Sequence, residues 1–503
     1  MNKQIRALAI AVCVCYLALF VQLNRIQLLD APSLTKRSDN TRTQERDYNR
    51  PRGTITSADG TLLAVSDPTG SERFAFQRRY PTGDLFAHVV GSFSFQYDVD
   101  GVEREYGDAL AGRIPELQLS GFTAPFDKRP NVGNVVLTLR DDLQRVAKEQ
   151  LGDRKGSVVA LDPRDGRVLA MWSYPSYDPN KTSSNDQKLA LFARQLLDAD
   201  PAKPRLARAW RDRYAPGSTF KVVTAAAGLE SGKVTVDSPS YPVRTSYTPP
   251  LTKRPLRNFG GEACGGTLVA LLRVSCNTGF AQMGAETLGP QPLIERSAAF
   301  GFDSVPPIDL PGAVRSVFPT DFGRQMRPGT DTSAPIYENT PALAQSAIGQ
   351  FDVSASPLQM ALVAAGIANG GQVMRPHVLA SVNDRSGAVA KTLPNEVWTT
   401  ATSPETSAVL RAAMIEVVRR GTATRLAIQG MEVGGKTGTA QLGTDPPRSH
   451  AWIIGFAGPP GEPPHVAVAV IVEGQEGASE QTGGRVAAPI ARAVMAAALS
   501  AGI

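Results

Sequence analysis

The sequence has few of the residues that metal sites and nucleic-acid sites require. Its 503 residues include four scattered histidines, and neither an H-E-x-x-H nor a C-x-x-C spacing occurs. These gaps argue against a catalytic metal, and we expect no cofactor. The net charge is only +6. Because the basic residues form no stripe interleaved with aromatics, we do not expect nucleic acid as a partner.

Long hydrophobic runs are also scarce, which makes the one at the N-terminus informative. Residues 7–23 are apolar except for Gln22, and this length is at the lower limit for crossing a bilayer. No small-residue cleavage site follows, so we expect an uncleaved signal anchor in the cytoplasmic membrane. Residues 1–6 would then be a cytoplasmic tail. Long domains are exported largely regardless of flanking charge, so we expect the rest outside; the alternative is a buried N-terminal helix.

The remaining chain has ordinary globular composition, with 42% hydrophobic and 20% charged residues, and its length suggests two or three domains. Residues 24–50 are polar and predict a stalk. Residues 51–67 read as two short strands around the turn Ala58-Asp59-Gly60, and Gly, Pro and aromatic residues continue to about 130. We therefore predict a stalk and β-rich pedestal over 24–135 and a second domain over 136–503.

The second domain carries strand patterns near both of its ends. Periodicity predicts a helix over 141–151, a hairpin over 156–173, strands at 450–458 and 465–473, and an Ala-rich helix over 485–500. Helical patterns, including 218–230 and 356–371, lie between them. Strands from both ends with helices between predict an α+β fold with one antiparallel sheet covered by helices.

Ser218 and Lys221 are the first candidates for chemistry. If a helix begins at Gly217 or Ser218, the two side chains lie one turn apart on one face, with Cβ atoms about 5–6 Å apart. The free N–H groups of the first turn would favour an anion there. Burial would lower the pKa of Lys221 and let its amine take the serine proton.

The Ser-x-x-Lys pair alone is weak evidence, because a chain of this length contains about two by chance. A second pair, Ser33 and Lys36, lies in the stalk, and the simpler reading of such a serine is a helix cap. The order of three motifs is more specific. Ser218-x-x-Lys221 is followed by Ser275-Cys276-Asn277 and then by Lys436-Thr437-Gly438-Thr439.

The Lys436–Thr439 segment precedes two strands and is predicted to be a strand beside them. A strand edge that carries a lysine and hydroxyl groups can bind a carboxylate, and its backbone can pair with an extended peptide. We expect Gly438 to let a substrate approach the strand closely.

The three motifs in this order resemble those of class B penicillin-binding proteins, the monofunctional peptidoglycan D,D-transpeptidases. The segments "APGSTFKVVTAAAGLE", "VSCNTGFAQM" and "GGKTGTAQ" are similar to that family's transpeptidase domain, most of all to the penicillin-binding protein A type of actinobacteria. The segment "RPRGTI…ADGTLLA" resembles its pedestal motif, with Ser57-Ala58 where the family usually has Asp-Arg. The resemblance implies a dimerisation-like pedestal and a transpeptidase domain with a five-stranded antiparallel sheet.

The resemblance also implies a role for each candidate residue. Ser218 would be acylated by a stem peptide ending in D-Ala-D-Ala, and Lys221 would be its base. Ser275 would relay a proton to the leaving amine, and the amide of Asn277 would orient the substrate. Lys436 would support the electrostatics of the pocket. The hydroxyl groups of Thr437 and Thr439 would bind the terminal carboxylate. Backbone N–H groups of Ser218 and Thr439 would form the oxyanion hole.

The implied partners are stem peptides and lipid-linked glycan strands, β-lactam antibiotics, the cytoplasmic membrane, and a glycosyltransferase with division or elongation proteins. Alternative functions are a β-lactamase, a D,D-carboxypeptidase, and a non-catalytic β-lactam sensor or division scaffold. The N-terminal anchor, the extra residues before the catalytic domain and the complete motif set argue against each. Cys264 and Cys276, twelve positions apart, form a disulfide in an exported chain or are two small buried residues, and the sequence leaves both open.

Overall fold

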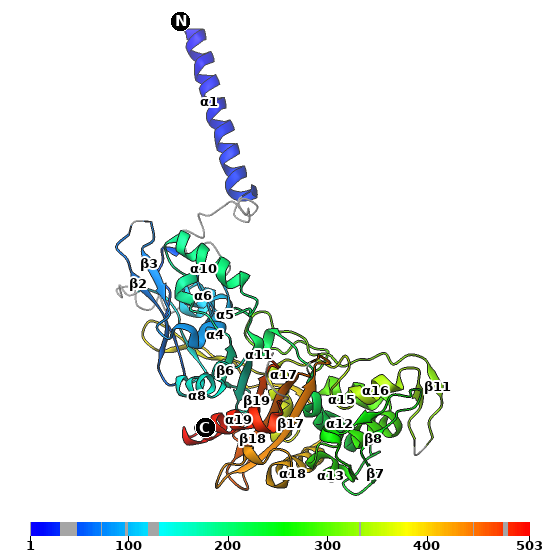
Figure 1. Ribbon diagram of the computed structural model, residues 1–503. Coiled ribbons are helices and arrows are strands. Elements are labelled where there is room, and N and C mark those ends of the chain that lie inside the picture. The colour runs from blue at the N-terminus through cyan, green and yellow to red at the C-terminus, as the bar shows by residue number, and fades with distance from the viewer. Residues whose placement is uncertain are drawn as a thin grey trace. The chain divides into compact units, whose positions relative to one another are not determined.

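Figure 1 shows the computed structural model of the chain. It describes residues 2–30, 48–71, 73–95, 99–118, 130–330, 333–445, 447–475 and 481–503. The chain divides into two compact units, Met1–Pro51 with Asp67–Gln77, and Arg52–Ser66 with Arg78–Ile503. Most of the predicted stalk, including the second Ser-x-x-Lys pair, lies outside the described residues.

The smaller unit contains the N-terminal helix α1 (Asn2–Asn24), which continues as the π-helix η1 (Arg25–Asp30). The window Lys3–Gln27 has a mean hydropathy of 2.2, none of it is buried, and its length and composition suffice to cross a membrane. The helix is longer than the predicted 7–23. Its exposure contradicts the alternative of a buried N-terminal helix.

The predicted pedestal contains a six-stranded sheet of order β15-β14-β4-β1-β2-β3. Its strands are β1 (Ile55–Thr56), β2 (Leu62–Pro68), β3 (Phe76–Arg79), β4 (Asn134–Leu137), β14 (Leu379–Asn383) and β15 (Val389–Lys391). β14 pairs antiparallel with β4, so residues 379–391, which the sequence places in the second domain, complete this sheet. Short helices accompany it: η2 (Gly83–Phe86), α4 (Ala87–Val90), α5 (Gly101–Glu105) and α6 (Gly107–Leu110).

The predicted five-stranded antiparallel sheet is present, in the order β17-β18-β19-β5-β6. Its strands are β5 (Gly156–Leu161), β6 (Val168–Tyr174), β17 (Glu432–Gln441), β18 (Ser449–Gly458) and β19 (Val466–Val472). All residues of β5 and β19 are buried, as expected for strands covered on both faces. The hairpin and the two late strands predicted from periodicity are confirmed.

Helices cover this sheet on both faces. The three that the sequence predicts here, over 141–151, 356–371 and 485–500, have bounds within a few residues of the predicted ones. α19 (Gly483–Ser500) packs on β18 and β19 together with α8 (Asp141–Leu151), and α17 (Pro357–Ala368) packs on β19 and β5. α18 (Pro404–Arg420) packs on β17. In Figure 1, α17 and α19 lie close to β17, β18 and β19.

The remaining elements form the helical part and its short ribbons. The helices are α9 (Pro179–Thr182), α10 (Gln187–Ala199), α11 (Arg208–Arg211), η3 (Gly217–Phe220), α12 (Lys221–Glu230), η4 (Phe259–Gly261), α13 (Leu268–Arg273), α14 (Asn277–Gln282), η5 (Met283–Leu288), α15 (Pro290–Ala299), α16 (Thr340–Ser346) and η6 (Thr424–Leu426). The strands are β7 (Tyr241–Arg244), β8 (Ser246–Tyr247), β9 (Leu256–Arg257), β10 (Cys264–Gly266), β11 (Gln325–Arg327), β12 (Ile336–Tyr337), β13 (Gln372–Met374) and β16 (Val397–Thr400).

Candidate active site

Ser218 lies in the first turn of the helix that the sequence predicts there. That turn is the 3₁₀ segment η3, and α12 continues it from Lys221. The residue at the N-cap position is Pro216, and Ser218 lies inside the turn, which argues against the reading of Ser218 as a helix cap. Gly217 has a φ of +54°, and a Cβ there would meet the carbonyl oxygen of Thr439 at 2.8 Å. The glycine therefore lets the serine turn lie directly against β17.

The residues before Ser218 are held by the neighbouring strands. Trp452 of β18 donates its Nε1–H to the carbonyl of Ala215 at 3.1 Å. The hydroxyl of Tyr214 donates to Glu473 at 2.8 Å, and the Tyr214 ring makes an edge contact with Trp452. These contacts fix the chain three and four positions ahead of the serine.

Lys221 is fully buried and contacts the second motif. Its Nζ donates to the carbonyl oxygen of Ser275 and to Oδ1 of Asn277, both at 2.6 Å. Nδ2 of Asn277 donates to the carbonyl of Arg257 at 3.0 Å, which turns Oδ1 toward the lysine. A neutral amine has two N–H groups, so two such acceptors leave its lone pair available for a proton.

Burial, and next to it the charge of Lys436, hold the pKa of Lys221 well below its ordinary value. A lysine with a lowered pKa is a base at neutral pH. Burial also lowers the pKa of Lys436 to about 7. Ser275, at a φ of +60°, presents its Oγ to both amines, at 2.8 Å from Lys436 Nζ and 3.3 Å from Lys221 Nζ.

The third motif lies on β17, as predicted. Thr437 exchanges a hydrogen bond with Thr422 at 2.7 Å, and Thr437 and Thr439 line the same cavity as Ser218. The expectation for Gly438 is wrong. A Cβ at Gly438 would lie 2.9 Å from Pro216 O, Thr219 Cγ2 and Trp452 Cβ, so the missing side chain makes room for the serine turn and β18, not for a substrate.

The cysteines of the soluble part form a disulfide, Cys264–Cys276, with an S–S distance of 2.10 Å. It joins β10 to the residue between Ser275 and Asn277. Asn258 adds a second link. Its Oδ1 accepts from the N–H of Thr278 at 3.0 Å, and its Nδ2 donates to the carbonyl of Glu262 at 2.9 Å.

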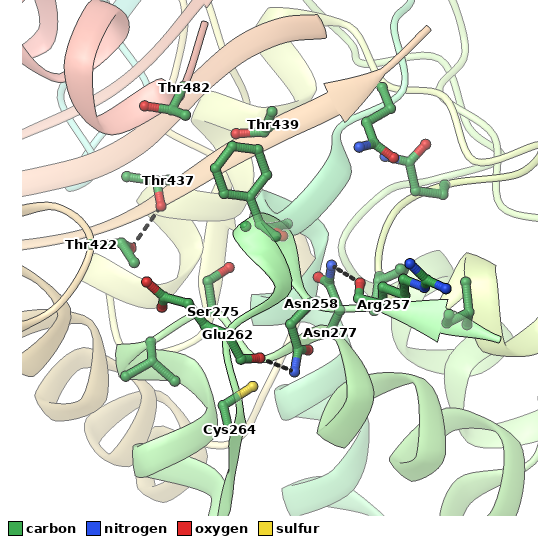
Figure 2. Close-up of a pocket in the computed structure, with 18 of the residues that line it drawn as sticks. Arg257, Asn258, Glu262, Cys264, Ser275, Asn277, Thr422, Thr437, Thr439 and Thr482 are labelled. Atoms are coloured by element: carbon green, nitrogen blue, oxygen red, sulfur yellow. Dashed lines mark hydrogen bonds between the residues drawn. The ribbon is translucent and has the colours of Figure 1, made fainter. Parts of the chain in front are cut away.

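These groups surround one cleft of about 1220 Å³ (Figure 2). We call the part formed by β17 and the turn 215–220 the strand wall. We call the part formed by residues 255–265 with Ser275–Asn277 the loop wall. The first residues of α19, Gly483 and Gly484, also line the cleft. The structure therefore brings all eight predicted catalytic and substrate-binding residues to one place. Five of them line the cleft, Gly438 packs against the serine turn, and Lys221 and Lys436 are buried behind Ser275.

Sequence reasoning missed several residues of this site, namely Thr422, Asn258, Arg257, Glu262, Tyr214 and Trp452. Trp452 falls in a predicted strand, so its burial was predictable but its bond to Ala215 was not. Arg257 ends the two-residue strand β9, and the others lie outside the helices and named strands. None of these segments has a periodic pattern, and no sequence signal marks their contacts.

A buried lysine beside an accessible serine, a second lysine on a strand edge and a shared bridging hydroxyl make a centre for acyl transfer to serine. On an antiparallel sheet covered by helices, this arrangement defines the class of penicillin-recognising serine enzymes.

The chain belongs to the penicillin-binding protein family. Residues 156–496 match the family described as penicillin binding protein transpeptidase domain. Residues 52–136 match the penicillin binding protein A dimerisation domain. The predicted family and its pedestal are thereby confirmed.

Curated relatives match this chain over nearly its whole length, and a solved structure matches most of it. The peptidoglycan D,D-transpeptidase PbpA of Mycolicibacterium smegmatis is 38% identical over 516 residues, which is 100% of each chain. PbpA of Mycobacterium tuberculosis is 37% identical and covers 99% of each chain. The penicillin G acyl-enzyme structure of M. tuberculosis penicillin-binding protein A has a TM-score of 0.77 at 36% identity, covering 90% of this chain and 100% of that one.

Proposed function

We propose that this protein is a peptidoglycan D,D-transpeptidase that cross-links stem peptides through an acyl-enzyme on Ser218 and is inactivated by β-lactams. The observation that carries the proposal is the hydrogen bonding of Ser275 Oγ to both Lys221 and Lys436, in a cleft that Ser218 lines. The three motifs are thus joined in one proton-transfer network.

Acylation uses the groups in sequence. Ser218 Oγ attacks the carbonyl carbon of the penultimate D-Ala, and its proton passes to the neutral amine of Lys221. The peptide C–N bond breaks, and the leaving D-Ala takes a proton through Ser275. The hydroxyl groups of Thr437 and Thr439 hold the terminal carboxylate, and Lys436 supports the electrostatics of the pocket. N–H groups of Ser218 and Thr439, carried on two segments that meet at Gly217, stabilise the oxyanion, each by about 10²–10³ in rate.

The second half-reaction consumes the ester. An amine of a neighbouring stem peptide attacks its carbonyl carbon, the bond to Ser218 Oγ breaks, and the serine recovers a proton. The apolar helix α1 anchors the chain in the cytoplasmic membrane with the catalytic part outside, where lipid-linked glycan strands are joined. A glycosyltransferase and division or elongation proteins are its expected partners there.

Labelling with a fluorescent penicillin tests the proposal. The wild type should be labelled, and peptide mapping should place the adduct on Ser218. The variants Ser218→Ala and Lys221→Ala should both remain unlabelled while melting at the wild-type temperature. Persistent labelling of the Ser218→Ala variant would mean that another residue is the nucleophile.

A further inference from the structure

One helix of the larger unit, α10, exposes a strip of apolar side chains. Leu189, Phe192 and Leu196 are 60%, 60% and 57% exposed. They lie three and four positions apart, so they share one face of the helix, which we call the apolar strip. Among the described residues, no other α-helix after α1 has an exposed large hydrophobic side chain. Scattered apolar side chains on a surface are ordinary, but several together on one helix mark a contact surface.

The apolar strip borders an open space. Its three residues line a cavity of about 710 Å³ together with residues of the segment 176–184. Only Ala190 of the helix is buried, so α10 lies on the surface of the larger unit and is not part of its core. A group as large as a lipid acyl chain can therefore reach the strip.

The charges beside the apolar strip favour an anionic partner. Lys181 and Lys188 are exposed, and neither amine has a hydrogen bond or an ion pair with a residue that the structure describes. The carboxylates of the same segment are occupied, because Asp178 caps α9, Asp186 caps α10, and Asp198 pairs with two arginines. Apolar side chains flanked by lysines suit a phospholipid surface, where the amines reach the headgroup phosphates.

The protein's own anchor brings such a surface close. The helix α1 is long and apolar enough to cross a membrane. Seventeen residues, 31–47, separate η1 from Tyr48, and a chain of that length reaches at most about 60 Å. A tethered group meets its target at a millimolar effective concentration, so even a short apolar strip can dock. The tether alone does not decide which face of the larger unit meets the bilayer.

We propose that α10 is a second membrane contact of this protein, in addition to the anchor α1. The apolar strip enters the boundary between headgroups and acyl chains, about 5–10 Å deep, and Lys181 and Lys188 bind anionic headgroups. The contact sets the orientation of the larger unit on the bilayer. The proposal rests on anchoring by α1 and does not depend on the chemistry at Ser218.

Quenching by spin-labelled lipids tests this proposal. The full chain is placed in lipid nanodiscs that contain phosphatidylglycerol. Cys13→Ser and Cys15→Ser remove the free thiols and leave the disulfide intact, so an NBD fluorophore attaches only to an introduced thiol. On the Phe192→Cys variant, emission should shift to shorter wavelength and nitroxide lipids should quench about half of it, because the probe lies at the headgroup boundary. The Val305→Cys variant, at a position 55% exposed, is the matched control and should show neither effect.

Substitutions in the apolar strip should undock the helix. The fluorophore is now placed on the Gln195→Cys variant, at an exposed polar position of α10, where quenching reports the ratio of docked to undocked protein. Leu189→Gln and Leu196→Gln should each lower this ratio about tenfold, because each removes one apolar side chain from the boundary. Val305→Gln should keep the wild-type ratio.

Substitutions of the lysines should matter only on an anionic surface. Lys181→Gln and Lys188→Gln should each lower the same ratio about fivefold in nanodiscs with phosphatidylglycerol. In nanodiscs of phosphatidylcholine alone they should leave it unchanged. Lys253→Gln removes an exposed lysine far along the chain from α10 and is the matched control, with no change in either lipid.

Three results would overturn the proposal. A shifted emission from the Phe192→Cys variant without nitroxide quenching would show that protein covers the strip, and dependence of that shift on two copies per nanodisc would identify a second copy of this chain. Emission that is neither shifted nor quenched would show that the strip faces water. Equal quenching at positions 192 and 305 would show that no particular face binds the bilayer.

Discussion

The two walls of the cleft are built in different ways. The strand wall rests on a continuous ladder, in which every residue of β17 from Glu432 to Gln441 pairs with β18. The loop wall has only the short pairings of β9 with β8 and of β10 with β7. Between them it depends on one disulfide and a few side-chain bonds from Asn258 and Asn277. A ladder tolerates the loss of any one bond but not an inserted atom. A loop held by one disulfide and a few side-chain hydrogen bonds tolerates added atoms at its exposed face but not the loss of one of these links.

We therefore expect the largest loss of acylation when an atom is added inside the strand wall. Gly438→Ala adds a Cβ at 2.9 Å from Pro216 O and Thr219 Cγ2, which forces β17 and the serine turn apart. A displacement of this kind should lower the rate of acylation by benzylpenicillin about 10²–10³-fold. Stopped-flow or gel-based acylation kinetics measure it.

The control for this variant is Gly107→Ala. In α6 a Cβ meets its nearest neighbour at an ordinary 3.6 Å, so acylation should stay at the wild-type rate. If Gly438→Ala acylates as fast as the wild type, the serine turn does not depend on close contact with β17.

Removing the disulfide of the loop wall should lower both the stability of the protein and its rate of acylation. Cys264→Ser with Cys276→Ser opens a loop that the crosslink closes over 12 positions, and loop entropy predicts a loss of about 3 kcal/mol in the free energy of unfolding. Acylation should also slow, because Cys276 sits between Ser275 and Asn277. Denaturant unfolding and penicillin kinetics report the two effects.

The pair Cys13→Ser with Cys15→Ser is the matched control, since these thiols of α1 are free. It changes the same chemistry without a crosslink. An unfolding free energy equal in both double variants would show that the bridge does not stabilise the loop wall.

The same contrast explains what the sequence could predict. Apolar runs and the order of the three motifs predict β17, β18 and the helix after Ser218, because periodic burial leaves a periodic pattern in the sequence. Asn258 acts through side-chain bonds to backbone groups of Arg244, Glu262 and Thr278. The carbonyl of Arg257 accepts from the side chain of Asn277. Such bonds have no period. The pairing of β14 with β4 joins segments more than 200 residues apart. The role of Gly438 was misassigned because a pattern identifies a glycine without showing which neighbour occupies the space.

The lowered pKa of Lys436, the buried lysine of the strand wall, should make the free energy of unfolding depend on pH. The pKa of Lys436 falls from 10.5 to about 7 on folding, so between these values the unfolded chain binds more protons than the folded one. The free energy of unfolding contributed by Lys436 should thus rise with pH, by about 1.4 kcal/mol per unit. Melting between pH 7 and 9 should show this slope in the wild type.

Lys436→Met removes this titrating group and should lower the slope by about 1.4 kcal/mol per unit, with higher stability than the wild type at pH 7. The slope that remains comes from Lys221, whose pKa is also held well below its ordinary value by burial and by the charge of Lys436. Lys253→Met, at an exposed position, is the control and should keep the wild-type slope. Parallel slopes in all three proteins would mean that Lys436 is not desolvated in the folded state.

The smallest expected effect concerns the single bond that joins β18 to the serine turn. Trp452→Phe removes the Nε1–H that Ala215 O accepts at 3.1 Å but keeps an aromatic ring against Tyr214. The lost bond is worth about 1 kcal/mol, so acylation should slow about fivefold. Trp172→Phe is the matched control, because Trp172 lies buried on β6 of the same sheet and its indole nitrogen has no hydrogen-bond partner among the residues that the structure describes. If both variants slow acylation equally, lost volume in the sheet explains the effect. If only Trp452→Phe does, the ladder positions the nucleophile through this bond as well as through packing.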